Sequence, residues 1–238
     1  MLLFYIRHGD PIYTPDSLTP RGERQAEALA KRLGLFGLDR VFTSTSNRAK
    51  LTAKPTCELL NLTPVELDWC NENHTWRELA MVNAEGRRMW LFQNNEILPL
   101  LASKELLDLG DKWYLHDRFA NTTYREGMER IQKEADAFLA ELGYRHCAGE
   151  GYYTAEKPTD ERVALFAHQG FGLAFLSCIL DIPYPKFCSH FDMSHSSMTV
   201  IAFNEFNGIA IPKVLQLSND SHLYREGILT GYNNGVRF

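Results

Sequence analysis

The chain has little cysteine, no long apolar run and no excess of positive charge. Its five cysteines form no CxxC pair, and their odd number argues against a closed disulfide framework, so we expect a reducing cytoplasm. The longest apolar runs fall well short of the roughly 20 residues that a membrane span requires, and no basic segment opens a secretion signal. A net charge of −5 provides no global field that would attract nucleic acid or anionic lipid.

The composition is that of an ordinary globular protein. Hydrophobic residues make up 45% of the chain and charged residues 23%, both close to average. A length of 238 residues suits one large α/β unit with a common core. We therefore expect residues 1–238 to form a single domain.

The first part of the chain alternates between strand and helix patterns. Leu2 to Ile6 is a continuous apolar run, typical of a strand that is covered on both faces. Thr19 can cap a helix whose first residue is Pro20, with Gly34 as its stop. The next expected elements are a strand at Arg40 to Thr43, a helix from Asn47 to Leu60 and a strand at Val65 to Leu67. This order predicts a parallel sheet.

The middle of the chain turns helical before the α/β pattern resumes. We expect a helical insertion over residues 76–147, followed by a loop from Ala148 to Asp160. A strand at Val163 to Ala167, a helix at Gly170 to Leu180 and a hairpin of Met198 to Phe203 with Ile209 to Leu217 complete the prediction. The expected class is α/β: three layers, α/β/α, with a mostly parallel central sheet and a helical insertion after the third strand.

Cations and imidazoles follow three of the expected strands. The segments are Arg7-His8-Gly9, Thr43-Ser44-Thr45-Ser46-Asn47-Arg48 and His168-Gln169-Gly170. Because ligands bind beyond the carboxyl ends of parallel strands, the three segments can build one phosphate pocket. Arginine forks and imidazole donors stabilise a phosphoryl group in transfer without a metal ion, and a second imidazole can act as nucleophile. A side chain in place of Gly9 would crowd a bound phosphate or bar an unusual backbone angle.

These segments, taken in order, resemble the histidine phosphatase superfamily, which includes the cofactor-dependent phosphoglycerate mutases. The similarity also covers Leu18 to Gly22, Thr52-Ala53 and the helical insertion, and so runs over most of the chain. It implies that His8 is the nucleophile and that Arg7, Arg48 and His168 clamp the phosphate, with Gly9 and Gln169 beside them. It also implies a reaction that needs no cofactor.

The family places a glutamate beyond the third strand as the general acid, and Glu72 is our choice here. The small, glycine-containing sequence that usually follows this glutamate is replaced by Asn73-His74-Thr75-Trp76. The alignment can therefore slip, and Asp68 or Glu78 stays an alternative.

Three functions fit these residues. The first is a phosphatase that forms a phosphohistidine and hydrolyses it, acting on a small phosphomonoester. The second is a mutase, which the Asp10-Pro11-Ile12-Tyr13 sequence argues against, because family mutases follow the glycine with a different pattern. The third is a module that binds phosphate without turnover.

Other residues have simpler interpretations. His190, Asp192 and His195 match no strong zinc signature, so a polar loop explains them and no metal is expected. Trp69 and Trp76 flank Glu72 and are candidates for a substrate pocket, although large aromatics are more often core residues. An apolar helix containing Met89 to Phe92, with Ile97 to Leu101, could be a contact between subunits of a homo-oligomer.

Overall fold

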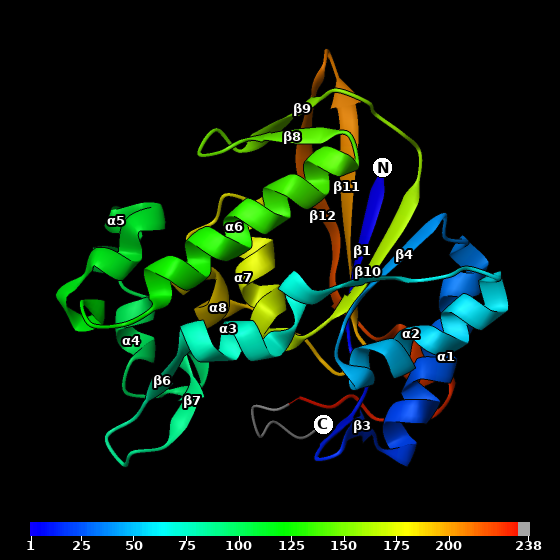
Figure 1. Cartoon of the computed structure of the whole chain (residues 1–238), viewed down its shortest axis with the longest axis horizontal. Helices are drawn as coiled ribbons and strands as arrows, with labels where there is room; N and C mark the ends of the chain where they lie inside the picture. The colour runs from blue at the N-terminus through cyan, green and yellow to red at the C-terminus, as the bar shows by residue number, and fades with distance from the viewer. Residues whose placement is uncertain (233–238) are drawn as a thin grey trace.

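An eight-stranded sheet forms the centre of the molecule (Figure 1). The computed structural model describes residues 1–232, so the last six residues of the expected domain lie outside the described residues. The strands lie in the order β5 (Val65–Leu67), β4 (Arg40–Ser44), β10 (Arg162–Ala167), β1 (Leu2–Arg7), β11 (Met198–Phe206), β12 (Ile209–Asn219), β9 (Tyr152–Ala155) and β8 (Tyr144–Cys147).

The sheet is parallel in one half and antiparallel in the other. β5, β4, β10 and β1 pair in parallel, whereas every pairing from β1 through β11 to β8 is antiparallel. The predicted α/β class is confirmed. The predicted mostly parallel sheet is found only in the half that runs from β5 to β1, because the other half is antiparallel. The chain enters β11 antiparallel to β1, the tight turn at Asn207 and Gly208 (φ 53° and 81°) returns it as β12, and the β8–β9 hairpin adds the last two strands.

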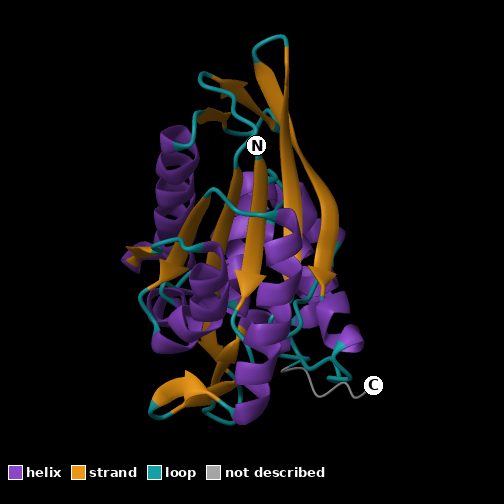
Figure 2. Ribbon diagram, turned by 90° about the vertical axis from the view of Figure 1, so that its right-hand side faces the viewer, coloured by secondary structure: helices purple, strands orange, loops and turns teal. Residues whose placement is uncertain are grey.

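Helices cover both faces of the sheet, as Figures 1 and 2 show. One face carries α1 (Pro20–Phe36) and α2 (Asn47–Leu60), and the short α9 (Ser221–Arg225) packs against α1. The other face carries α3 (Glu72–Leu79), α6 (Tyr124–Glu141), α7 (Gln169–Ile179) and α8 (Tyr184–His190). This is the three-layer arrangement that the sequence predicts.

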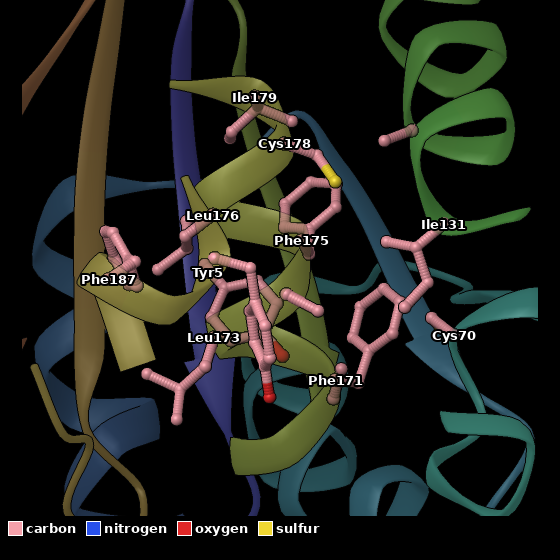
Figure 3. Packing of buried hydrophobic residues seen from close by; sticks show 14 of the residues in the cluster. Tyr5, Cys70, Ile131, Phe171, Leu173, Phe175, Leu176, Cys178, Ile179 and Phe187 are labelled. Atoms are coloured by element: carbon pink, nitrogen blue, oxygen red, sulfur yellow. The ribbon is translucent and has the colours of Figure 1, made fainter. Parts of the chain in front are cut away.

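Side chains of β1 alternate between the two cores. Phe4 and Ile6 belong to the cluster beneath α1 and α2, whereas Leu3 and Tyr5 belong to the larger cluster beneath α6 and α7. Figure 3 shows Tyr5 among the aromatic side chains of α7, where its ring stacks on Phe175 at 5.6 Å between centroids. The strand is thus buried on both faces, which fixes the position of the residues that follow it.

The first helix begins as predicted and ends later than predicted. The Thr19 side chain accepts a hydrogen bond from the Gly22 N–H at 3.0 Å, and Pro20 is the first helical residue. The helix continues through Gly34 to Phe36 and is capped by Gly37 at φ 72°. Gly34 is needed for packing instead, because a Cβ there would lie 2.7 Å from Leu59 on α2.

The insertion is largely helical, with two corrections. Its short helices are η2 (Leu91–Gln93), α4 (Leu98–Leu101), α5 (Lys104–Leu109), η3 (Gly110–Leu115) and η4 (Asp117–Phe119), and η1 (Asp68–Cys70) lies just before it. Residues predicted as an apolar helix at Met89 instead form β7 (Arg88–Trp90), paired with β6 (Ala80–Val82), and then η2. Likewise the expected loop after Ala148 contains β9, because Gly149 and Gly151 at φ 82° and 72° turn the chain back along β8.

A second small hairpin lies beside the carboxyl end of β1. β2 (Pro11–Tyr13) and β3 (Asp16–Leu18) pair in the segment between β1 and α1. The five cysteines all lie within the described residues and are free. No helix of the described chain is both long and apolar enough to cross a membrane.

Candidate active site

Three strand ends converge at one edge of the sheet, as the sequence predicts. In the parallel register Arg7 lies beside Ala167 of β10, and Thr43 of β4 lies beside Phe166. The next residues, His8 and His168, therefore meet: their ring centroids are 5.3 Å apart at an interplanar angle of 62°. Both imidazoles are buried.

The imidazole of His8 is oriented by its own loop. Nδ1 lies 2.7 Å from the Gly9 carbonyl oxygen, which can only accept, so Nδ1 carries the proton and Nε2 keeps its lone pair. Burial, reinforced by electrostatic interaction with His168 and by the positive charges of Arg7 and Arg48, holds the pKa of His8 well below its ordinary value. A neutral imidazole with a free Nε2 lone pair is the form that a nucleophile requires.

The second imidazole, His168, is held from the opposite side. Its Nε2 lies 2.8 Å from Ser44 Oγ and 3.3 Å from Ser46 Oγ. Its Nδ1 is buried, has no hydrogen-bond partner among the described residues and lies 3.6 Å from Glu72 Oε2. Burial, together with Arg48 and Arg7, holds the pKa of His168 well below its ordinary value.

Two buried arginines flank the histidines. Arg7 donates through Nη1 to the Met193 carbonyl oxygen, and burial lowers the pKa of its guanidinium, which stays charged at neutral pH. Arg48 binds Asp16 at 2.9 Å and Glu72 at 3.0 Å. Burial alone would lower the pKa of Arg48, but these carboxylates outweigh it and raise the pKa. The Nε atoms of both arginines are buried without a partner in the described part of the chain.

Glu72 is the carboxylate that reaches the histidines. It opens α3, accepts a hydrogen bond from the Gly170 N–H at 3.0 Å through Oε1 and contacts Arg48 through Oε2. The alternatives are engaged elsewhere: Asp68 bonds Thr45 and His74, and Arg130 holds both oxygens of Glu78. Of the three acids, the geometry favours Glu72.

Gly9 and Gln169 occupy the predicted edge with contacts of their own. The Gly9 N–H donates to Thr52 Oγ1 at 2.9 Å, and a Cβ on Gly9 would lie 2.8 Å from the Gly22 carbonyl oxygen. The absence of a side chain is thus explained by the close approach to α1 rather than by an unusual backbone angle. Gln169 is buried and donates through Nε2 to Asp192.

One set of side chains could hold a metal ion. Donor atoms of His8, Glu72 and His168 all lie within 4.8 Å of one another. His190, Asp192 and His195 form no such group in residues 1–232. Because Arg7 and Arg48 bring two positive charges to the same place, a divalent cation would be repelled there.

The sequence did not indicate that His195 lies in this site. Its buried ring stacks on His8 with centroids 6.0 Å apart at 29°, and its Nδ1 lies 3.4 Å from Asp10 Oδ1. The available signal was topological: β11 is antiparallel to β1 and begins at Met198, opposite Ile6. Residues just before β11 must therefore lie beside those just after β1.

A cavity of about 440 Å³ opens beside Arg48 and Glu72. Trp76 lines it, as one of the two tryptophan candidates, and Trp90 and Tyr13 line it too. Trp69 does not: it packs in the core against Phe138, Phe171 and Phe175.

Comparison with known proteins agrees with this arrangement. The family model described as histidine phosphatase superfamily (branch 1) matches residues 3–210. The chain belongs to this superfamily. No curated protein matches it.

Solved structures with the same fold are distant in sequence. A phosphoserine phosphatase from Entamoeba histolytica is 15% identical, with a TM-score of 0.59 over 93% of this chain and 98% of that one. A mycobacterial glucosyl-3-phosphoglycerate phosphatase is 18% identical, with a TM-score of 0.57 over 90% and 97%. The α-ribazole phosphatase of Shigella flexneri is 18% identical, with a TM-score of 0.59 over 92% and 97%.

Proposed function

We propose that this histidine phosphatase superfamily member hydrolyses phosphomonoesters through a phosphohistidine on His8, without a metal ion. One observation carries the proposal. Beside a neutral His8 imidazole, the buried Arg7 Nε, Arg48 Nε and His168 Nδ1 have no hydrogen-bond partner among the described residues. Buried donors are rarely left unpaired, so a bound anion is the natural acceptor for them.

In the first step, the His8 Nε2 lone pair attacks phosphorus and the bond from phosphorus to the ester oxygen breaks. Arg7, Arg48 and His168 stabilise the charge on the equatorial oxygens. Protonated Glu72 donates its proton to the departing oxygen, so that a neutral alcohol leaves. The Nδ1 proton of His8 stays hydrogen-bonded to the Gly9 carbonyl oxygen and fixes the ring throughout.

In the second step, a water molecule attacks the phosphohistidine. The Glu72 carboxylate accepts a proton from the water, the bond from phosphorus to Nε2 breaks and inorganic phosphate forms. His8 returns to its neutral form and Glu72 to its protonated form. Gly9 and Gln169 complete the proposed phosphate site.

Related proteins support the phosphatase over other uses of the same site. The three similar structures above are described as phosphatases. We further propose that residues 1–238 act as one domain in the cytoplasm on small-molecule substrates, which the odd number of cysteines and the acidic net charge support.

Turnover of p-nitrophenyl phosphate, with and without a bisphosphoglycerate, tests the proposal. A phosphatase releases phosphate steadily without the bisphosphate. Activity that requires the bisphosphate, with phosphate returned to a sugar acid, would show a mutase instead. Phosphate binding without turnover would show a binding module.

A further inference from the structure

The cavity beside the phosphate site has aromatic walls. Trp76 and Trp90 meet edge to face, with ring centroids 4.8 Å apart at an interplanar angle of 77°. The centroid of the Tyr13 ring lies 5.4 Å from the guanidinium carbon of Arg48. A volume of about 440 Å³ is within the range of small-molecule sites, roughly 300–1,000 Å³. Aromatic side chains in such a cavity favour flat apolar groups through stacking and burial of apolar surface.

The indole of Trp90 is held rigidly. It stacks on Phe92 at 5.7 Å and 10°, and its ring packs directly on Gly170, where a Cβ would lie 2.4 Å from Cζ2. Gly170 also donates its N–H to Glu72. The aromatic wall and the proposed proton donor are therefore positioned by the same turn at the start of α7.

The cavity is unfavourable for an anionic group. Among the described residues that line it, Arg48 is the one cation, and Asp16 and Glu72 both bind it. The other polar lining residues, Asn73 and Gln93, are neutral. Arg88 is not among the lining residues: its Nη2 donates to the carbonyl oxygens of Trp76 and Arg77, and its guanidinium carbon lies 6.0 Å from the centroid of the Trp76 ring. A second carboxylate or phosphate would thus find no unpaired cation in this lining.

Glu72 lines this cavity and also contacts the phosphate site. The oxygen that Glu72 protonates must therefore face the cavity, and the leaving alcohol must occupy it. We propose that the substrate is a phosphomonoester whose leaving alcohol carries an uncharged aromatic group close to the ester oxygen. The proposal rests on the phosphatase function. It differs from the carboxylate-bearing phosphate esters named for two of the similar structures, phosphoserine and glucosyl-3-phosphoglycerate.

Calorimetry of phosphonate binding to the full chain tests the proposed preference for an aromatic leaving group. Phosphonates are suitable because their carbon–phosphorus bond is not hydrolysed, so binding is measured without turnover. We expect benzylphosphonate to bind at least about tenfold more tightly than ethylphosphonate, which corresponds to about 1.4 kcal/mol. Phosphonoacetate, which carries a carboxylate, should bind no more tightly than ethylphosphonate. Equal affinities for benzyl and ethyl, or tightest binding of phosphonoacetate, would overturn the proposal and leave the phosphatase function standing. Failure of all three to bind would overturn both.

Two tryptophan variants test whether the aromatic walls of the cavity cause the preference for benzylphosphonate. Trp76→Ala and Trp90→Ala should each reduce the benzyl to ethyl affinity ratio by about threefold or more, since each removes one aromatic wall. Phe206→Ala is the matched control: Phe206 is a 72% exposed aromatic at the end of β11, far from the carboxyl end of β1. An unchanged ratio in both tryptophan variants would contradict the proposal, and the ranking in the unmodified protein tests it even if a variant fails to fold.

Discussion

The imidazole of His195 stacks on that of His8, with centroids 6.0 Å apart and planes inclined by 29°. His195 is buried, and its main-chain N–H is fixed by the Gly231 carbonyl oxygen at 2.9 Å. The His8 ring is thus confined by the Gly9 carbonyl oxygen at Nδ1 and by a rigid neighbour on its face. In the proposed mechanism such confinement would keep Nε2 aimed at phosphorus, so we expect His195 to act as a positioning residue.

We expect His195→Asn to lower kcat for p-nitrophenyl phosphate about tenfold with little change in KM, because a misplaced nucleophile still permits binding. His195→Phe keeps a ring against His8 and should retain more of the rate. Steady-state kinetics on the two variants measures the split between kcat and KM. A rate in His195→Asn equal to that of the unmodified protein would argue that the stacking has no role.

His8→Ala should abolish the covalent intermediate. Without Nε2 there is no nucleophile, so acid-labile, base-stable labelling by phosphorylated substrate should disappear. Rapid-quench labelling measures this, with circular dichroism to verify the fold. His190→Ala is the matched control, since His190 is a histidine outside the site whose Nδ1 contacts Ser189 and Lys186. Persistent labelling in His8→Ala would show that another residue carries the phosphoryl group.

The sequence predicts the parallel half of the fold because two of its strands, β1 and β10, are continuous apolar runs and recognisable helices separate the strands. β1 and β10 are buried on both faces, and the residues after them are brought together by the register alone. β8 and β9 were not predicted: each has only four residues, β8 is the edge strand and β9 lies next to it, where no long apolar run is required. His195 was missed because its place depends on the antiparallel pairing of β11.

Activity should survive chelation by EDTA, because Arg7 and Arg48 supply the positive charge that Mg²⁺ supplies in many phosphoryl-transfer enzymes. Vanadate should inhibit competitively, since it mimics five-coordinate phosphorus. Initial rates with EDTA, and with EDTA followed by excess Mg²⁺ or Zn²⁺, provide the measurement. Complete loss that a metal restores would instead point to ion binding by His8, Glu72 and His168, whose donor atoms lie within 4.8 Å of one another.

His146 should make stability depend on pH above neutrality. Its ring lies 2.8 Å from Asp136 and 3.2 Å from Asp181, tying β8 to α6 and to the end of α7. Burial alone would lower the pKa of His146, but these hydrogen bonds outweigh it and raise the pKa from 6.5 to about 9. A group whose pKa is raised in the folded state contributes its full stabilisation below its unfolded-state pKa. This stabilisation is lost as the pH rises through its folded-state pKa.

The unfolding free energy of the unmodified protein should therefore exceed that of His146→Gln most below pH 6.5, and the difference should shrink as the pH rises to about 9. The change should be on the order of 3 kcal/mol, since one pKa unit corresponds to about 1.36 kcal/mol. Urea unfolding of both proteins at several pH values measures it. A difference that stays constant over this range would mean that His146 is neutral in the folded state.

Glu72→Gln should separate proton donation from nucleophilic attack. The amide would keep the shape of the side chain but could not protonate the leaving oxygen, so hydrolysis of alkyl phosphates should slow by about 10²–10⁴-fold. The effect on p-nitrophenyl phosphate should be much milder, because nitrophenolate departs without a proton. Rates for a series of substrates that differ in leaving-group pKa measure the contrast.

Asp68→Asn and Glu78→Gln are the matched controls, because each removes a carboxylate near Glu72 in sequence that the structure holds away from His8 and His168. Asp68 contacts Thr45 and His74, and Glu78 is bound by Arg130 at 2.6 and 2.7 Å. Their leaving-group dependence should follow that of the unmodified protein. If Glu72→Gln slows all substrates equally, Glu72 stabilises Arg48 or the fold but is not the acid. If a control variant acquires the steep dependence instead, that carboxylate is the proton donor and must move toward His8 when substrate binds.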